Sequence, residues 1–282
     1  MKLGIDSNAK KYHKLYLTLI ISVFCYGLGF GRTQRKMKSS MLKRTWLLLH
    51  RQQSKRLLSS VQNNIFDRNL KKRHRKNHLN SPDSQYYNYL REESNRRLID
   101  RIDDINKTFP FGLEIGSHSG NLYTLINSYP SLRSDNGGVG GIERLLLCDS
   151  TVGANWPCNA TTAPIVSPLP VLCDEEYLPF KESTFDIVLS SLYLHWSNDL
   201  ETVMNNVYKV LKPDGVFIAS VLGNNTLKEL QDCFYFAENE RRGGMSFHTS
   251  PFARPSDIAG LMQAANFNLP TVDIDTITVR TL

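Results

Sequence analysis

Apolar and polar positions alternate along the chain in two distinct periods from about residue 86 onward. Short apolar runs have the length of buried strands, and some segments between them carry apolar residues at spacings of three and four, as on one face of a helix. Strands and helices in alternation predict an α/β fold with a mostly parallel sheet and helices on both faces. The expected strands are residues 111–116, 144–150, 171–180, 184–196, 215–221 and 271–279, and the expected helices are 86–105, 200–211, 226–240 and one that begins at Ser256.

Polar residues stand where the first three of these strands end. Glu114 precedes a turn that contains Gly116 and Gly120, while Asp149 closes the second strand and Asp174 stands in the third. Ligands of open parallel sheets bind beyond the carboxyl ends of the strands, so this edge predicts a small-molecule site. The glycines let a ligand approach the backbone, and a helix N-terminus after them offers free N–H groups. Asp149 is placed to bind ribose hydroxyls, although a simple helix cap explains one such acid equally well.

Charge divides the chain into two unlike parts. Residues 1–80 hold 19 Lys and Arg against two acids, whereas residues 81–282 hold 15 against 25, so the formal net charge of +7 conceals a basic leader and an acidic body. An acidic body repels a phosphate backbone, which disfavours nucleic acid as the main partner. A basic leader remains able to touch RNA or an anionic membrane.

The leader has the features of a targeting segment. Residues 15–30 are uncharged and apolar but shorter than the about 20 residues of a membrane helix, so they are also compatible with a signal-peptide core. From Met37 to about residue 62 the chain is rich in Arg, Lys, Ser and Leu and contains no acid, which is typical of a mitochondrial presequence. We therefore expect translation to begin at Met37 or Met41, with a disordered basic tail as the alternative.

The cysteines favour neither a zinc site nor a disulfide scaffold. The five cysteines form no CxxC sequence and show no paired spacing, which favours a reducing compartment. None of the seven histidines begins an HxD or HxE sequence of the kind a non-haem iron oxygenase uses, so no metal is expected. His195 is the one catalytic candidate by position, and packing at a strand–helix junction is the alternative explanation of it.

Several segments together resemble a known fold family. The chain resembles class I S-adenosylmethionine-dependent methyltransferases, which have a Rossmann-like sheet. The segments that carry this resemblance are E-x-G-x-x-x-G at Glu114–Gly120, Asp149, DEEYLPF, FDIVLSSLYLHW and LKPDGVF. NIFDR, YLREE, SSLYLHW and GGMSFHTSPF add a closer resemblance to mitochondrial complex I assembly factors of methyltransferase type, reported as protein arginine hydroxylases that act on an iron–sulfur subunit. This second resemblance covers about residues 63–280.

The resemblance implies roles for particular residues. Glu114, Gly116 and Gly120 would shape the methionine end of an S-adenosylmethionine site, and Asp149 would hold the ribose. The remaining residues implied are Asp174 and Glu175 near the adenine, and Ser190, Leu192 and His195 at the mouth after the fourth strand. His118 departs from the family, which has glycine there, and its side chain is expected to crowd the cofactor.

The resemblance also implies a domain division and a setting. We expect an extension with a presequence over residues 1–62, largely disordered, a helical lead-in over 63–108, and a methyltransferase-like domain over 109–282. Because the family adds an antiparallel strand at its C-terminal end, we expect that strand to be missing and a sheet edge to be left unpaired. The implied partners are an iron–sulfur subunit of complex I and, peripherally, the matrix side of the mitochondrial inner membrane.

Three functions remain open on the sequence alone. The first is the arginine-hydroxylating assembly factor, and the second is an S-adenosylmethionine-dependent methyltransferase of a small molecule. The third is an assembly scaffold that has lost its cofactor, which His118 and the expected missing strand favour. No nucleophile or acid–base pair is marked, and this agrees with methyl transfer, which needs mainly alignment of the two reactants.

Overall fold

A computed structural model gives the fold. It describes residues 14–25, 65–81, 84, 88–118, 120–128, 137–151, 164–244, 246 and 248–280. Of residues 14–25, 279 and 280 it describes the backbone only. Most of the predicted presequence, residues 37–62, lies outside the described residues, so that prediction stays a prediction.

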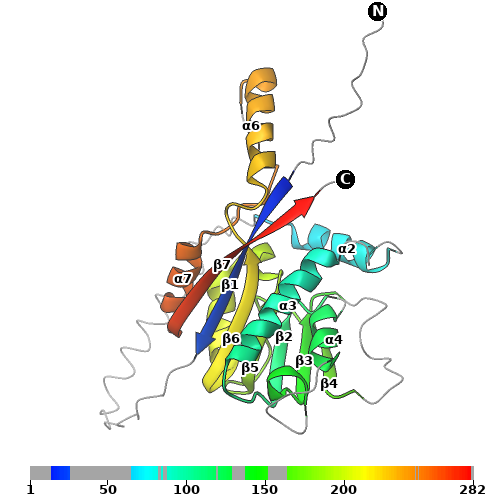
Figure 1. The fold of residues 1–282 in the computed structure, drawn as a ribbon, viewed down its shortest axis with the longest axis vertical. Helices are drawn as coiled ribbons and strands as arrows, with labels where there is room; N and C mark the ends of the chain where they lie inside the picture. The colour runs from blue at the N-terminus through cyan, green and yellow to red at the C-terminus, as the bar shows by residue number, and fades with distance from the viewer. Residues whose placement is uncertain are drawn as a thin grey trace, which may run out of the picture.

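One seven-stranded sheet organises the described chain (Figure 1), in the order β4-β3-β2-β5-β6-β1-β7. Neighbours among β2 to β6 are parallel, which confirms the predicted mostly parallel sheet. The order places β2 next to both β3 and β5, so the chain reverses its direction of winding there, and ligands of such sheets bind at this point. The strands are β1 (Lys14–Cys25), β2 (Phe111–Ile115), β3 (Arg144–Asp149), β4 (Ser167–Leu172), β5 (Phe185–Ser191), β6 (Leu211–Leu222) and β7 (Asn268–Arg280).

Helices cover both faces of the sheet and bury two apolar layers. The helices are α2 (Arg68–Leu79), α3 (Tyr89–Asp104), α4 (Asn121–Ser128), α5 (Leu200–Val210), α6 (Lys228–Arg242) and α7 (Pro255–Ala264), with 3₁₀ turns η2 (Val139–Gly141) and η3 (Leu194–Trp196). Successive residues of a strand face opposite sides, so Ile187 packs in the layer under α3 and α4, while Val188 packs in the layer under α5 and α7. This alternation explains why the middle of β5, Ile187 to Leu189, is apolar without interruption.

The apolar leader segment enters the sheet, contrary to expectation. Strand β1 lies between β6 and β7 and pairs antiparallel with both, with Ile20 opposite Val221 on one side and Ile274 on the other. Residues 14–25, within the extension that we expected to be largely disordered, thus form a strand, and the place between β6 and β7 is filled by it. The backbone N–H and C=O groups of an apolar segment can be hydrogen-bonded in a sheet as well as in a membrane helix. Here the segment pairs with the edges of β6 and β7.

Two further differences concern the elements around the sheet. Within the helical lead-in that we expected over residues 63–108 we placed no helix before residue 86, but the structure has helix α2 there, capped by the Asp67 carboxylate, which accepts hydrogen bonds from Asn69 N and Leu70 N. The third predicted strand ends earlier, at Leu172, so that its acids lie in the following turn. Among the described residues no helix is long and apolar enough to cross a membrane.

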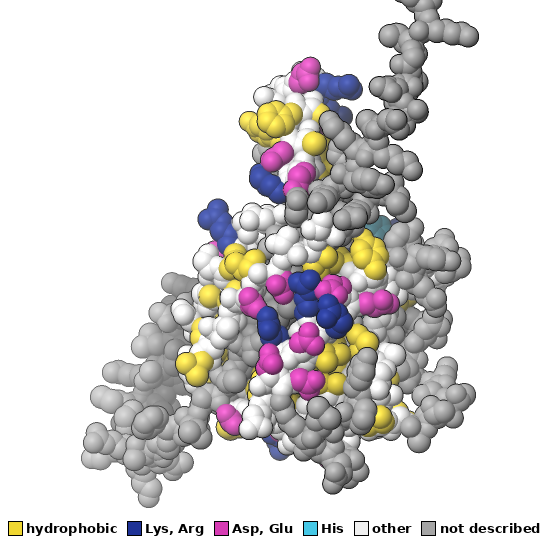
Figure 2. Space-filling view, viewed as in Figure 1, with side chains coloured by type: hydrophobic (Ala, Val, Ile, Leu, Met, Phe, Trp, Pro, Cys, Tyr) yellow, Lys and Arg dark blue, Asp and Glu magenta, His cyan; other side chains and the backbone are white. Residues whose placement is uncertain are grey.

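Charged side chains of both signs gather over α3 and β7 (Figure 2). Arg97 of α3 pairs with Asp275 of β7 at 3.1 Å, and Arg101 pairs with Asp273. Glu93 completes the group by pairing with Arg97 at 2.7 Å within the helix. These ion pairs attach the last strand to the body independently of its main-chain pairing with β1.

Candidate functional site

The turn after β2 forms the floor of the site. Gly116 has φ +76°, and an added Cβ there would meet the Tyr193 ring at 2.1 Å, so only glycine fits. Gly120 also has positive φ, and its N–H donates to Ser117 O just before α4 begins. Glu114 lies at the end of β2 with 2% of its surface exposed, and its Oε2 has no described partner. The turn thus brings the Tyr193 ring close to the backbone of Gly116, and one oxygen of the buried Glu114 carboxylate next to it has no described partner.

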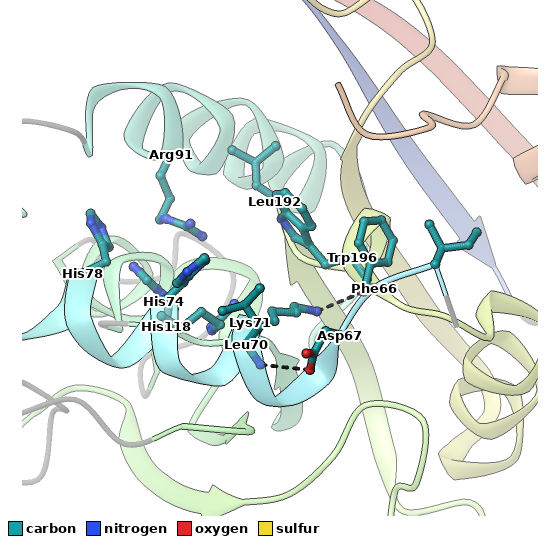
Figure 3. A pocket seen from close by; sticks show the side chains of 12 residues that line it. Phe66, Asp67, Leu70, Lys71, His74, His78, Arg91, His118, Leu192 and Trp196 are labelled. Atoms are coloured by element: carbon teal, nitrogen blue, oxygen red, sulfur yellow. Dashed lines mark hydrogen bonds between the residues drawn. The ribbon is translucent and has the colours of Figure 1, made fainter. Parts of the chain in front are cut away.

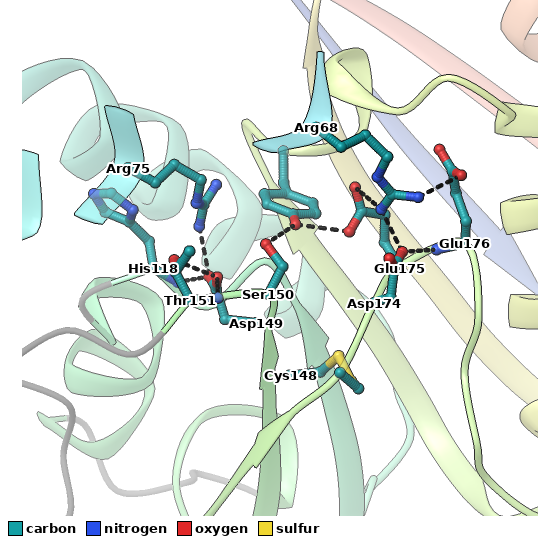
Figure 4. Close-up of a disulfide and its surroundings, with 12 residues drawn as sticks. Arg68, Arg75, His118, Cys148, Asp149, Ser150, Thr151, Asp174, Glu175 and Glu176 are labelled. Atoms are coloured by element: carbon teal, nitrogen blue, oxygen red, sulfur yellow. Dashed lines mark hydrogen bonds and ion pairs between the residues drawn. A yellow bond between two sulfur atoms is a disulfide. The ribbon is translucent and has the colours of Figure 1, made fainter. Parts of the chain in front are cut away.

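Asp149, at the end of β3, has every acceptor position in use. Its Oδ1 accepts hydrogen bonds from Thr151 N and Thr151 Oγ1 at 2.9 and 3.0 Å, and its Oδ2 accepts from His118 N at 2.8 Å. Arg75 of α2 adds an ion pair to Oδ2 at 2.5 Å (Figure 4). The carboxylate that was expected to hold ribose hydroxyls therefore binds a side chain of the protein itself.

The acids after β4 are likewise paired with α2. Arg68 forms ion pairs with Asp174 and, at 2.6 Å, with Glu176 (Figure 4). Glu175 is buried, accepts a hydrogen bond from the Tyr193 hydroxyl at 2.8 Å and lies 3.5 Å from Lys71 Nζ. The Asp174 carboxylate is partly exposed, whereas that of Glu175 is buried and holds the Tyr193 side chain through its hydroxyl.

Sequence reasoning missed the cationic face of α2. Arg68, Lys71 and Arg75 stand at spacings of three and four, so they share one helix face, and that face lies over the acids of the sheet edge. Lys71 and Arg75 also lie over the Tyr193 ring, 4.9 and 4.6 Å from its centroid. The spacing of these cations in the sequence was the available signal.

A cavity of about 420 Å³ lies between α2, α3 and the glycine turn (Figure 3). Its lining includes one acid, Asp67, and six basic side chains: Lys71, His74, Arg75, His78, Arg91 and His118. The guanidinium of Arg91 points into it, reaches Ser191 O at 3.5 Å and forms no ion pair with a described carboxylate. A buried cation without a paired anion is costly, so this cavity favours a ligand with an anionic group.

Burial shifts the protonation of three groups at this site. The pKa of Glu114 rises to about 8 because burial, and then the nearby Asp149 charge, disfavour its ionised form. The pKa of His118 falls to about 2, first through burial and then through Arg91 and Arg75, so the ring is neutral. Burial also lowers the pKa of Arg91, to about 10, which leaves the guanidinium charged at neutral pH.

His118 occupies the glycine-type conformation that its position requires. Its φ is +54°, its ring stacks on that of His78 with centroids 5.3 Å apart, and its buried Nδ1 has no described partner. The expectation that this ring faces the cofactor side agrees with its place in the lining of the cavity. A side chain at this backbone conformation is strained, so His118 carries a cost that glycine would not.

The residues after β5 separate into different environments. Ser190 is fully buried, and its hydroxyl donates to Ile115 O at 3.1 Å, so it links two strands and faces no cavity. Leu192 has φ +48°, is held by a hydrogen bond from its N–H to Ser220 O, and lines the cavity. His195 lines a second cavity of about 280 Å³ instead, packed against Phe252, and burial lowers its pKa to about 3. Its Nδ1 has no described partner.

A disulfide corrects the expectation drawn from cysteine spacing. Cys148 and Cys173 are bonded across β3 and the turn after β4, while Cys233 is free and exposed. Each bonded cysteine immediately precedes an acid of the site, Asp149 and Asp174 respectively. Spacing in the sequence could not show this pair because it forms between neighbouring parallel strands. In the described part of the chain no three metal-ligating side chains are grouped to hold a metal ion.

Comparison with known proteins gives this geometry a context. A family model described as a methyltransferase domain matches residues 158–219. The mitochondrial arginine-hydroxylase NDUFAF5 of Danio rerio is 40% identical over 217 residues, which cover 77% of this chain and 63% of that protein. Its namesake of Homo sapiens is 41% identical over 217 residues, which cover 77% of this chain and 59% of that protein. The chain thus spans less than two thirds of the length of these curated relatives.

A solved structure shows a similar arrangement at low sequence identity. The complex of the Haloferax volcanii Trm112 methyltransferase activator with its methyltransferase is matched with a TM-score of 0.47 and 15% identity, over 68% of this chain and 75% of that one. The resemblance expected from the sequence is confirmed by the matched domain and the curated relatives. This chain therefore has the Rossmann-like class I methyltransferase fold, a methyltransferase-domain model matches its residues 158–219, and its sequence is similar to those of the mitochondrial arginine-hydroxylases.

Proposed function

We propose that this chain binds S-adenosylmethionine at the edge formed by β2, β3 and β4. The unpaired Oε2 of Glu114 fits the ammonium of the methionine part, and the Arg91 guanidinium fits its carboxylate. Gly116 lets the Tyr193 ring pack directly against the backbone of the turn. This complementarity of one unpaired acid and one unpaired base within a single site carries the proposal. When bound, the cofactor supplies a methyl group activated by a sulfonium.

The ribose and adenine ends require a rearrangement of α2. Asp149 would bind the ribose hydroxyls and Asp174 the adenine amino group, but Arg75 and Arg68 hold these carboxylates. Cofactor entry therefore exchanges two ion pairs for hydrogen bonds to the ligand. Asp149 keeps its bonds from His118 N and Thr151 N during this exchange, so its orientation is preserved.

The function that the names of the relatives support best is hydroxylation of arginine in the mitochondrion. We propose an iron–sulfur subunit of complex I as the protein substrate and the matrix side of the mitochondrial inner membrane as the place. The names of the relatives, at about 40% identity, support the activity and the organelle, and the resemblance of the sequence to complex I assembly factors is the ground for the subunit and the membrane side. The acidic balance of residues 81–282 supports a protein partner over a nucleic acid.

Calorimetry with S-adenosylmethionine tests the cofactor step. We expect saturable binding to the wild-type chain and loss of binding in Asp149→Ala. Asp232→Ala is the matched control, because Asp232 is an exposed acid on α6 that pairs only with Lys228 among the described residues. Absence of binding at millimolar ligand would leave a scaffold function in place of an enzyme.

Mass spectrometry of complex I subunits tests the reaction. Depletion of this protein is expected to remove a modification with the mass of one oxygen atom from an arginine of an iron–sulfur subunit. Re-expression of the wild-type chain restores that mass, and Asp149→Ala does not. An arginine whose mass is the same in depleted and control mitochondria contradicts the hydroxylase proposal even where cofactor binding has been observed.

The cavity favours a second candidate function, methyl transfer to a small anionic acceptor. Lys71, Arg75 and Arg91 make its lining positive, which suits a carboxylate and repels a guanidinium. A transfer assay with labelled cofactor and carboxylic-acid acceptors separates the two candidates. Label in the acceptor supports methyl transfer, and an oxygen added to arginine without label supports hydroxylation.

A further inference from the structure

The Cys148–Cys173 disulfide connects the acids of the proposed ribose and adenine contacts (Figure 4). Cys148 lies in β3 directly before Asp149. Cys173 follows β4 directly before Asp174, and its N–H donates a hydrogen bond to Asp149 O at 3.0 Å. The disulfide and this hydrogen bond together hold the start of the turn after β4 against the end of β3. They therefore set the spacing of the two carboxylates.

The main chain of Cys148 also holds the glycine turn after β2. Its carbonyl oxygen accepts hydrogen bonds from Gly116 N at 2.8 Å and from Ser117 N at 3.2 Å. The next residue, His118, donates from its N–H to Asp149 Oδ2 at 2.8 Å. A shift of Cys148 would therefore reach both the turn, whose His118 lines the cavity, and the carboxylate at the end of β3.

The turn after β4 is firmly attached at its far end and less firmly at its near end. Glu176 Oε1 accepts hydrogen bonds from Ser197 Oγ at 3.0 Å and Asn198 N at 2.8 Å, which fixes the far end to the segment after β5. At the near end, Asp174 pairs with Arg68, which cofactor entry would displace. Strand β4 is the edge of the sheet, and among the described strands it pairs with β3 alone. The position of Asp174 therefore depends largely on the disulfide once Arg68 has left.

The two sulfur atoms differ in accessibility. Cys148 is 1% exposed, whereas Cys173 is half-buried. Thiol–disulfide exchange begins when a thiolate attacks a sulfur that it can reach, and partly accessible bonds are more often regulatory than purely structural. The sequence predicts a reducing compartment, where protein disulfides are mostly transient or redox-sensing.

We propose that the bond between Cys148 and Cys173 is a reversible redox switch that sets the affinity of the cofactor site. The oxidised chain binds the cofactor tightly, and the reduced chain binds it weakly. This effect on affinity rests on the proposed function, whereas the opening of the bond and the movement of the turn do not depend on it. A dithiol opens the switch, and a disulfide oxidant closes it.

The chemistry is a two-electron exchange between the disulfide and a dithiol. A thiolate of the dithiol attacks Cys173 Sγ, the bond between the two protein sulfurs breaks, and Cys148 Sγ leaves and takes up a proton. The second thiolate of the reductant then attacks its own sulfur in the mixed disulfide and releases Cys173, which is protonated in turn. Two electrons and two protons thus pass to the chain, and the reductant leaves as a cyclic disulfide. Oxidised glutathione reverses the exchange.

Reduction of the folded full-length chain tests whether the bond opens under native conditions. The protein is incubated with dithiothreitol in native buffer, quenched with acid, unfolded and labelled with a maleimide, and mass spectrometry of its peptides locates the label. We expect label on Cys148 and Cys173 only after reduction, and on Cys233, which is free and exposed, in both cases. Treatment with oxidised glutathione before the quench should abolish labelling of the first two. A bond that opens only in denaturant is structural, and this result overturns the proposal.

Calorimetry with S-adenosylmethionine compares the two states of the same protein. We expect the reduced chain to bind about tenfold more weakly than the oxidised chain, because a displaced Asp174 loses its hydrogen bond to the adenine. Reoxidation should restore the affinity. Cys148→Ser with Cys173→Ser should bind as weakly as reduced wild type in both buffers, whereas Cys233→Ser should respond as wild type does. Equal affinities of the oxidised and reduced wild type overturn the proposal.

Hydrogen exchange without ligand separates the switch from the proposed cofactor. On reduction, the amides of Gly116, Ser117 and Cys173 are expected to lose protection, because their acceptors are the carbonyl oxygens of Cys148 and Asp149. Amides within β5 and β6 should keep theirs. If neither state binds S-adenosylmethionine, the cofactor proposal fails and this exchange still decides the switch. Unchanged protection of the three amides after reduction overturns it.

Discussion

Arg75 of α2 forms an ion pair with Asp149 at the end of β3, with Nη2 and Oδ2 2.5 Å apart and 74 positions of sequence between them. The Asp149 side chain is fully buried and that of Arg75 is 12% exposed, so the pair is shielded from solvent. In the family that this chain resembles, the acid at this position holds the cofactor ribose. Helix α2 therefore covers this carboxylate, and in the proposed function Arg75 would compete with the cofactor for it.

Removal of the Arg75 guanidinium should reveal this competition. Arg75→Ala is expected to bind S-adenosylmethionine several-fold more tightly than wild type, since Asp149 no longer has to exchange partners. The same change should lower the free energy of unfolding by about 2 kcal/mol, because a buried pair is broken while Asp149 keeps three other hydrogen bonds. Calorimetry and urea unfolding measure the two effects. Arg73→Ala, an exposed cation on the same helix, should change neither, and weaker binding by Arg75→Ala would show that α2 assists the cofactor instead.

Glu114 predicts a pH dependence of stability. Its pKa in the folded chain is about 8, above the ordinary value of 4.5, so between these values the folded state binds a proton that the unfolded state has released. The contribution of Glu114 to stability is therefore complete below about pH 4.5 and is lost as the pH rises to about 8. Glu114→Gln should abolish this part of the slope in unfolding experiments at a series of pH values, and it should weaken cofactor binding. Parallel slopes for the two proteins would contradict the shifted pKa.

Replacement of His118 should restore the glycine of the family pattern. His118→Gly removes a strained positive-φ side chain and a ring from the cavity lining, so we expect tighter binding of S-adenosylmethionine. The pKa of His118 is about 2 in the folded chain, against 6.5 normally, so wild type loses stability as the pH falls below about 6.5. The variant should lose less over the same range. His118→Ala keeps the strained backbone but removes the ring. It should therefore resist acid as well as His118→Gly does, but its free energy of unfolding should rise less than that of His118→Gly. Acid unfolding curves identical to wild type would contradict the neutral buried ring.

The disulfide should support both the fold and the position of the two acids. A bond between residues 25 positions apart stabilises the folded state by about 3 kcal/mol through loss of unfolded-state freedom. Cys148→Ser with Cys173→Ser should show this loss in thermal unfolding and should weaken cofactor binding, since each cysteine precedes an acid of the site. Cys233→Ser is the matched control, because Cys233 is free and exposed. If a reducing agent lowers the melting temperature of wild type but leaves that of the double variant unchanged, the bond is present in solution.

Residues close together in sequence allowed most elements to be predicted. The period of apolar positions in α5 predicted that helix near its observed bounds, whereas the strand predicted over residues 184–196 ends at Ser191, before the turn η3. Glu114 and Asp149 were placed at strand ends for the same reason. Ser190 was misjudged, because alternation alone did not show that its hydroxyl bonds Ile115 O inside the sheet.

What the sequence by itself determined is the α/β pattern, the succession of strands and helices along the chain and the acids near the strand ends, since these follow from local periodicity and from rules of chain connection. Only the tertiary structure decided the partners of those acids on α2, the bond between Cys148 and Cys173, and the place of residues 14–25 in the sheet. Each of these joins segments remote in sequence. Such contacts depend on which faces and edges remain free after the local elements have formed, and that information exists only once the chain is folded.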